Sequence, residues 1–363
     1  MNRKIPIRTQ SHEYTAHVGQ NILSDALEAT LSSQRIDVLF VLIDDNVFEH
    51  HWPEIAMVLQ AHTVQVLHMK VPEGEKSKSV EFWSEVMDFL LNNKVRRNSP
   101  LIVIGGGVTG DLGGFAAATA LRGLPLIHIP TTLLAMVDSS IGGKTGVNHD
   151  AGKNLIGSFY QPETVIADTR FLDTLPEREW INGLSEILKY GAISDQNIFR
   201  QAEIFLKKDF KSADVIVLIE LIATCIKIKA GIVEQDEFEG GIRAYLNFGH
   251  TFAHALEKAS HYNTISHGEA VFLGMLAAKK LSELTGSNFA EDYLDKFRSL
   301  YTYRVSKENL SLDELTEHMH SDKKRTGKDL NFVLLKEWQH PVVKTVKDIQ
   351  LIHQAWSAAL NEL

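Results

Sequence analysis

Two kinds of hydrophobic pattern divide the chain, and they limit its fold more than any other feature. In the first half, short and continuously apolar runs, such as residues 36–44 and 63–70, alternate with segments of helical spacing. Apolar strands that alternate with helices are typical of a parallel sheet covered on both faces. From about residue 176 onward nearly every segment is helical, except two strand-like runs at 330–335 and 341–346.

The sequence therefore predicts two domains, as expected for 363 residues, because one core seldom exceeds about 250–300 residues. We expect an α/β domain over residues 1–176 and a mostly α-helical domain over residues 177–363. The long helical patterns of the second domain cover residues 195–235, 239–260 and 267–286.

Charge and composition exclude several classes of function. The formal net charge of −9 argues against a nucleic-acid partner. No apolar run approaches the ~20 residues that span a membrane, and the polar N-terminal residues lack the apolar core of a signal peptide. The single cysteine, Cys225, rules out a disulfide framework and fits a reducing compartment, so we expect a cytoplasmic protein.

A glycine-rich turn follows the predicted strand LIVIG and opens a helical pattern. Gly105, Gly107 and Gly110 form a G-x-G-x-x-G frame, in which small residues let the backbone approach a pyrophosphate at a helix N-terminus. A tight turn with close helix packing is the alternative interpretation. Because no acidic residue ends the next strand, a dinucleotide ribose would need another partner, and Asp44, at the end of the first long strand, is a candidate.

A second turn-rich stretch covers residues 130–162. Long glycine-rich segments in compact domains are usually functional or disordered, and the interleaved apolar residues argue against disorder. Hydroxyl, amide and lysine side chains on such a backbone suit a polyhydroxylated anion, whereas a well-ordered surface loop is the alternative. The polar members are Thr131, Thr132, Asp138, Ser139, Ser140, Lys144, Asn148, Lys153 and Asn154.

Candidate metal ligands gather in the helical half. The stretch LNFGHTFAHALE places His250 and His254 one helical turn apart, and spacing alone favours this pair for zinc, with Glu186 and His267 as further candidates. A purely structural role for the histidines is an equal alternative. Glu186 and Lys189 lie at i and i+3, a spacing that usually gives only a solvated ion pair.

Further polar residues precede these histidines. Arg243, Asn247, His250 and His254 fall at i, i+4, i+7 and i+11, near one face of the helix predicted there, and indicate a cleft wall rather than a solvent-facing stripe. Other charged residues of this half are Lys229, Asp236, Glu239, Lys323 and Lys324.

Seven motifs, in order, resemble those of the 3-dehydroquinate synthase family. They are GGGVTGDLGGF, PTTLLAMVDSSIGGKTGVNH, GKNLIGSFYQP, GLSEILKYG, LNFGHTFAHALE, HGEAV and SDKK, and the resemblance extends from about Pro72 to Leu335. It implies a Rossmann-like N-terminal domain with a parallel sheet, a mostly α-helical C-terminal domain, bound NAD, one divalent metal (zinc or cobalt) and a homodimer. The chain departs from the family pattern at Ser185, where alanine is usual, and by an extra residue before His267.

The resemblance also implies roles for individual residues. Glu186, His250 and His267 would be the metal ligands, and His254 would lie beside the substrate, which replaces the pair favoured by spacing. The residues implied at NAD are Glu73, Gly74, Glu75, Lys76, Ser77, Lys78, Gly107, Val108, Thr109, Gly110, Asp111, Thr131, Thr132, Asp138, Lys144, Lys153, Phe171, Leu172, Asp173 and Thr174. Those implied at the substrate are Arg122, Lys144, Lys153, Asn154, Lys189, Lys229, Arg243, Asn247, His254, Lys323 and Lys324.

The activity implied by the resemblance is that of a phosphate-eliminating lyase in the shikimate pathway, which leads to chorismate and the aromatic amino acids. The substrate would be a phosphorylated keto acid, 3-deoxy-D-arabino-heptulosonate 7-phosphate, and the products 3-dehydroquinate and phosphate. The steps would be transient NAD-dependent oxidation, phosphate loss, re-reduction and intramolecular aldol closure. Two alternatives are another sugar-phosphate cyclase and a metal- and NAD-dependent alcohol dehydrogenase of the glycerol dehydrogenase type.

Overall fold

The computed structural model describes the chain except residues 1, 33–35, 64, 208–209, 261–263 and 324–329. By its internal contacts the chain forms two compact units: Met1–Glu179 with Asp214–Phe238, and Trp180–Ala213 with Glu239–Leu363. The domain boundary between residues 176 and 177 stays a prediction. The hydrophobic pattern gave no sign that Asp214–Phe238 packs with the first half of the chain.

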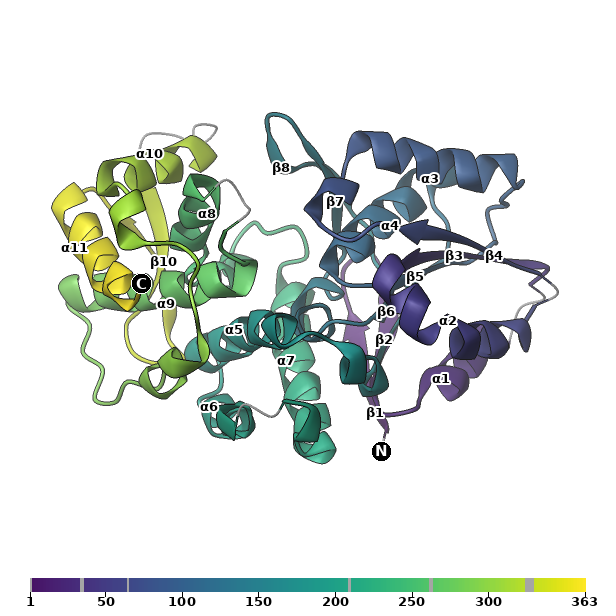
Figure 1. Ribbon diagram of the computed structural model, residues 1–363, viewed down its shortest axis with the longest axis horizontal. Helices are drawn as coiled ribbons and strands as arrows, with labels where there is room; N and C mark the ends of the chain where they lie inside the picture. Colours follow the sequence, from purple (N-terminus) through teal and green to yellow (C-terminus); the bar gives the residue numbers. More distant parts are fainter. Residues whose placement is uncertain (1, 33–35, 64, 208–209, 261–263, 324–329) are drawn as a thin grey trace. The chain divides into compact units, whose positions relative to one another are not determined.

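A seven-stranded sheet forms the centre of the first unit, in the order β1-β2-β9-β6-β5-β3-β4 (Figure 1). Only β1 and β2 pair antiparallel, and the other neighbours in this sheet are parallel. The strands are β1 (Asn2–Arg8), β2 (Glu13–Gly19), β3 (Val38–Asp44), β4 (Gln65–Val71), β5 (Leu101–Gly105), β6 (Leu126–Pro130) and β9 (Thr164–Asp168). The predicted parallel sheet is thus confirmed, whereas the β1–β2 hairpin was not predicted.

The helices of this unit connect the parallel strands, and α7 packs on β1 and β2. They are α1 (Leu23–Leu31), α2 (Asp45–Gln60), α3 (Val80–Asn92), α4 (Gly107–Thr119) and α7 (Val215–Gln235). A separate antiparallel hairpin, β7 (Lys144–His149) and β8 (Gly152–Phe159), packs against α4. This hairpin and a π-helix at Ala135–Ser139 occupy most of the turn-rich stretch, so the interpretation of that stretch as a surface loop is wrong.

The order of the parallel strands locates an expected binding edge. Taken in chain order, β3, β4, β5, β6 and β9 are arranged 2-1-3-4-5, one of the two common doubly wound orders. Ligands of such sheets bind beyond the carboxyl ends of the strands on either side of the point where the order reverses. Those strands are β3 and β5, whose pairing places Ile43 beside Ile104, so Asp44 and Gly105 end side by side.

Helices dominate the second unit. They are α5 (Glu177–Ile193), which begins in the first unit, α6 (Asn197–Ala202), α8 (His250–Ala259), α9 (His267–Leu284), α10 (Leu312–Lys323) and α11 (Ile349–Ala359). The antiparallel strands β10 (Leu330–Leu335) and β11 (Pro341–Val346) confirm the two strand-like runs. Helix α9 packs against α8, α11 and β10 and is buried on nearly every side, as expected for a central helix.

The long helix predicted over residues 239–260 is wrong in its first half. Ile242–Asn247 forms a short 3₁₀ helix, and α8 begins only at His250. Gly249 separates them with a φ of +82°, and a Cβ there would lie 2.8 Å from the backbone nitrogen of Met275 on α9. The spacing suggested that Arg243 and Asn247 share a helix face with His250. They do not, because they lie in a different helix. Likewise, the helical pattern predicted over residues 195–235 is divided, because α6 and two short 3₁₀ helices, Glu203–Lys207 and Phe210–Ser212, precede α7.

None of the helices in the described ranges is long and apolar enough to cross a membrane.

The packing of α4 on β5 gives a test of the fold. A Cβ on Gly113 would lie 2.6 Å and 2.7 Å from the two methyl carbons of buried Val103, whereas a Cβ on Gly231 of α7 would have nothing within 4 Å. We expect Gly113→Ala to lower the free energy of unfolding by about 1–3 kcal/mol through overpacking. Gly231→Ala should raise it by about 0.5–1 kcal/mol, because alanine favours the helix. Urea denaturation measures both, and equal effects would contradict this packing.

Candidate active site

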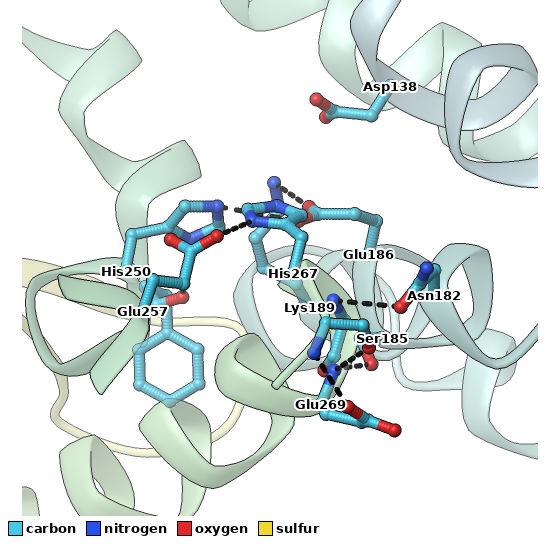
Figure 2. A network of polar contacts seen from close by, with 12 residues as sticks. Asp138, Asn182, Ser185, Glu186, Lys189, His250, Glu257, His267 and Glu269 are labelled. Carbon is cyan, nitrogen blue, oxygen red and sulfur yellow. Dashed lines mark hydrogen bonds and ion pairs between the residues drawn. The ribbon is translucent and has the colours of Figure 1, made fainter. Parts of the chain in front are cut away.

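Three helices bring one carboxylate and two imidazoles together. Glu186 lies within α5, whereas His250 and His267 are the first residues of α8 and α9. The Nε2 atoms of His267 and His250 lie 3.2 Å and 3.4 Å from the same oxygen, Oε1 of Glu186. One candidate ligand atom from each residue lies within 4.8 Å of the others, and the side chains point toward one another (Figure 2). This donor set is one that zinc commonly takes.

In each imidazole, Nδ1, the ring nitrogen that faces away from Glu186, contacts an oxygen atom. Nδ1 of His250 lies 3.2 Å from the carbonyl oxygen of Phe248, and Nδ1 of His267 lies 3.4 Å from Oε1 of Glu257. Since a carbonyl and a carboxylate only accept, Nδ1 carries the proton in both rings. With Nδ1 protonated, Nε2 is the ring nitrogen left to bind a metal when one is present. Protein metal sites commonly hold their histidines in this way.

The charge of Glu186 is compensated locally. Its side chain is 1% exposed and that of its ion-pair partner Lys189 is 2% exposed, so this pair is buried and not the solvated pair that such spacing usually gives. Burial opposes ionisation, but Lys189, His250 and His267 outweigh it and hold the pKa of Glu186 well below its usual value. Burial also lowers the pKa of His250, against the opposing effect of Glu186. For His267, burial is outweighed by Glu186 and Glu257, which raise its pKa to about 10.

The first turn of α9 is fixed to α5 through Gly268. The Gly268 N–H donates to Oδ1 of Asn182 at 3.1 Å, and the hydroxyl of Ser185 donates to the Gly268 carbonyl at 2.7 Å. A side chain on Gly268 would overlap the backbone of Asn182. The hydroxyls of Ser185 and Tyr301 lie 2.8 Å apart. Ser185, where the family usually has alanine, therefore adds bonds beside the grouped side chains that alanine cannot make.

His254 lies outside the group of three. It is exposed on α8, and its ring centre lies 5.7 Å from that of His250 in an edge-to-face arrangement. Glu257, which faces His267, was not among the predicted site residues. The signal was available, because Glu257 lies seven residues after His250 and therefore on the same face of the helix.

The first unit gathers several of the predicted NAD residues. Lys78 is buried and pairs with Asp111 of α4. Burial raises the pKa of Asp111, although the charge of Lys78 opposes the shift. Nδ2 of Asn148 donates to Oε1 of Glu75 at 2.7 Å, and Nζ of Lys153 lies 4.0 Å from the same oxygen. These contacts join the segment after β4 to the β7–β8 hairpin.

The glycine turn has the predicted strand–turn–helix form. Helix α4 begins at Gly107, and its N-cap, Gly106, offers no side chain to bond the N–H groups of the first turn. A Cβ on Gly106 would lie 3.0 Å from Cγ2 of Thr132, so glycine lets β5 approach the segment after β6. Thr131 also joins these two segments, because its N–H donates to the carbonyl oxygen of Gly105 at 3.0 Å. The predicted residues Val108, Thr109 and Gly110 lie in the first turns of α4.

Asp138 and Lys229 meet within the first unit. Nζ of Lys229 donates to the carbonyl oxygen of Asp138 at 2.8 Å and to its Oδ2 at 3.0 Å. Asp138 belongs to the π-helix Ala135–Ser139, and π-helical turns occur frequently at functional sites. A predicted NAD residue and a predicted substrate residue are therefore in direct contact.

Other predicted NAD residues have structural partners. Asp44 caps α2, because one of its carboxylate oxygens accepts from the backbone N–H groups of Asn46 and Val47. Within the 3₁₀ helix Thr169–Thr174, Phe171 and Leu172 are buried, and the hydroxyl of Thr174 lies 2.8 Å from Nε2 of His51. Burial is also the first cause of a raised pKa at Asp44. The remaining members, Glu73, Gly74 and Lys76, are exposed after β4, whereas Ser77 is buried and donates to the Pro72 carbonyl at 2.6 Å.

The predicted substrate residues vary in exposure. Arg122 and Lys144 are exposed, and Arg122 stands in a run of three positive φ angles with Leu121 and Gly123. The backbone N–H of Asn154 donates to Oδ1 of Asn148. In the second unit Arg243 is buried, and Nδ2 of Asn247 donates to Glu239 at 3.1 Å. Lys323 ends α10, and Lys324 lies outside the described residues.

Comparisons with known proteins agree with the motifs. The families described as 3-dehydroquinate synthase N-terminal and 3-dehydroquinate synthase C-terminal match residues 68–182 and 183–325. The chain is 41% identical over 363 residues to the 3-dehydroquinate synthase of Listeria monocytogenes serotype 4b (strain F2365), covering 99% of this chain and 98% of that relative.

Two solved structures share the whole fold. One is 2-epi-5-epi-valiolone synthase from Streptomyces hygroscopicus subsp. jinggangensis 5008 with NAD⁺ and Zn²⁺ bound, with a TM-score of 0.87, 26% identity, and coverage of 98% of this chain and 99% of that one. The other is 2-deoxy-scyllo-inosose synthase complexed with carbaglucose-6-phosphate, NAD⁺ and Co²⁺, with a TM-score of 0.83, 25% identity and the same coverage. Both family domains match in order along one chain, and the identity is higher to the Listeria enzyme than to either cyclase, so this chain belongs to the 3-dehydroquinate synthase family.

Proposed function

We propose that this chain is a 3-dehydroquinate synthase. It converts 3-deoxy-D-arabino-heptulosonate 7-phosphate to 3-dehydroquinate and phosphate, and so acts as a carbon–oxygen lyase in the shikimate pathway. The observation that carries this function is the convergence of Glu186, His250 and His267, in a chain 41% identical over its length to a named 3-dehydroquinate synthase. Its cofactors are NAD and one divalent metal, zinc or cobalt.

The residues present fit a divalent metal. Glu186, His250 and His267 supply three ligands of the types that zinc takes, which leaves positions open for substrate oxygens. When bound, the metal holds neighbouring hydroxyls of the substrate and polarises the carbon–oxygen bond at the carbon to be oxidised. Lys189 balances the charge of Glu186 in the absence of substrate.

The first unit also fits a dinucleotide. The uncapped N-terminus of α4 supports a pyrophosphate, and its glycines leave room for close approach. Asp44 and Gly105 end adjacent strands where the strand order reverses, the usual position of a nucleotide in such sheets. When bound, NAD would supply a reversible hydride acceptor for the substrate and so would be regenerated within one turnover.

Several charged and polar residues are proposed to hold an anionic substrate. We assign the phosphate and carboxylate of the substrate to lysine and arginine side chains, which form strong charge-assisted hydrogen bonds with anions. His254 is exposed one turn beyond His250, where an imidazole can exchange a proton as phosphate leaves. The substrate residues proposed are Arg122, Lys144, Lys153, Asn154, Lys189, Lys229, Arg243, Asn247, His254, Lys323 and Lys324.

The active form proposed is a cytoplasmic homodimer. The single cysteine, Cys225, is buried and forms no disulfide, which suits a reducing compartment. Another sugar-phosphate cyclase would use the same cofactors on a different heptulose phosphate, and identification of the product decides between them. An alcohol dehydrogenase of the glycerol dehydrogenase type would differ in accumulating NADH.

NAD should act catalytically. We expect pure protein with the heptulosonate phosphate and NAD far below the substrate concentration to release many equivalents of phosphate per NAD. The reason is that the hydride removed in the first step returns before the product leaves. Phosphate release that stopped at one equivalent per NAD, with NADH accumulating, would show a net dehydrogenase instead.

His250 should hold metal and His254 should not. Replacing His250 by alanine removes one of three grouped donors, so His250→Ala should purify with little metal and little activity. His254→Ala should keep nearly full metal content and turn over poorly, because its ring lies outside the group. Elemental analysis of both proteins provides the test. If both variants lose metal to the same extent, the i, i+4 pair is the site and our assignment is wrong.

Arg122 and Lys153 should bind anionic groups of the substrate or NAD. Each loses a charge-assisted hydrogen bond on replacement by alanine, so kcat/KM should fall by about 10–100-fold. The melting temperature should change little, because neither residue belongs to the core. Unchanged kinetics in both variants would remove them from the site.

A further inference from the structure

We propose that Glu257 is a positioning residue that sets the ring of His267 for metal binding. The proposal rests on the metal site of the proposed function. Glu257 is buried near the end of α8, and its Oε1 lies 3.4 Å from Nδ1 of His267, the nitrogen that faces away from Glu186 (Figure 2). A carboxylate can only accept there, so it keeps a proton on Nδ1 and leaves Nε2 as the nitrogen that a metal would take.

The two histidines differ in how they are held. Nδ1 of His250 faces a main-chain carbonyl only two residues away, and the side chain of His250 is 12% exposed. The side chain of His267 is 36% exposed, and its Nδ1 faces a side chain from another helix. With less packing around it, the ring of His267 has more freedom to rotate. Apart from Glu186, which both rings face, the orientation of His267 therefore depends on the side chain of Glu257, whereas that of His250 depends on the main chain.

The hydrogen bonds at the start of α9 hold its backbone and do not orient the ring of His267. Asn182 and Ser185 hold the backbone of Gly268, and Ser266 with Glu269 forms a capping box at the helix start. These contacts fix the Cα position of His267 but not the rotation of its ring. When a carboxylate that hydrogen-bonds a metal-ligating histidine is removed, metal affinity commonly falls by about 10–100-fold.

The test uses the full chain, stripped of metal and titrated with Co²⁺, whose visible absorption reports ligand geometry. Glu257→Ala removes the acceptor, and Glu257→Gln keeps an acceptor but removes the charge. Glu269→Gln is the matched control, because Glu269 is equally a buried carboxylate in this region but caps α9. Melting temperatures of the metal-free proteins separate a loss of folding stability from a loss of metal binding.

We expect Glu257→Ala to bind Co²⁺ about 10–100-fold more weakly than the wild type, with an altered visible spectrum. Glu257→Gln should recover most of the affinity and the wild-type spectrum. Glu269→Gln should melt at a lower temperature but bind Co²⁺ like the wild type. If Glu257→Ala does not fold, Glu257→Asp takes its place, because the shorter side chain does not reach Nδ1.

Three results would overturn the role of Glu257 alone: wild-type affinity in Glu257→Ala, equal losses in Glu257→Ala and Glu257→Gln, or an equal loss in Glu269→Gln. A wild-type chain that binds no Co²⁺ would instead overturn the metal site itself, and this proposal with it. The two failures are therefore distinguishable from one titration series.

Discussion

The negative charge of Glu186 is the constraint around which the second unit is arranged. A buried carboxylate is costly unless neighbouring groups compensate it, and Glu186 is 1% exposed. Lys189 supplies a charge from the same helix, whereas His250 and His267 come from two others. Removing one partner of a buried ion pair commonly costs about 3–5 kcal/mol. Thus α5, α8 and α9 meet where this charge is compensated, and the same meeting groups three side chains of the types that zinc takes.

Two glycines make this meeting possible. Gly249 precedes His250 in a left-handed conformation and lies against the backbone of Met275, while Gly268 follows His267 and lies against the backbone of Asn182. Each histidine thus begins a helix where two backbones approach closely. Side chains at the starts of separate helices can converge from different directions. His254, one turn further along α8, lies outside the group, and its side chain is exposed.

The sequence allowed the parallel sheet, the helical second half and the glycine turn to be predicted, because each depends on local periodicity or local turn chemistry. It did not reveal the β1–β2 hairpin or the β7–β8 hairpin, whose strands contain polar residues and glycines rather than continuous apolar runs. The break at Gly249 was missed because helical spacing continues across it. Spacing on one helix favoured His250 with His254 and gave Glu186 and His267 only as further candidates. The structure groups Glu186, His250 and His267, since tertiary packing decides which helix starts meet.

The serine at position 185 is explained by a partner on another segment. A buried tyrosine hydroxyl is unfavourable without a hydrogen bond, and the ring of Tyr301 is stacked on Phe272 in the interior. Ser185 accepts from Tyr301 while donating to the carbonyl of Gly268, so one hydroxyl satisfies both groups. Alanine at this position would leave the Tyr301 hydroxyl without this bond. Ser185 therefore joins Tyr301 to the first turn of α9, a link that alanine at this position could not make.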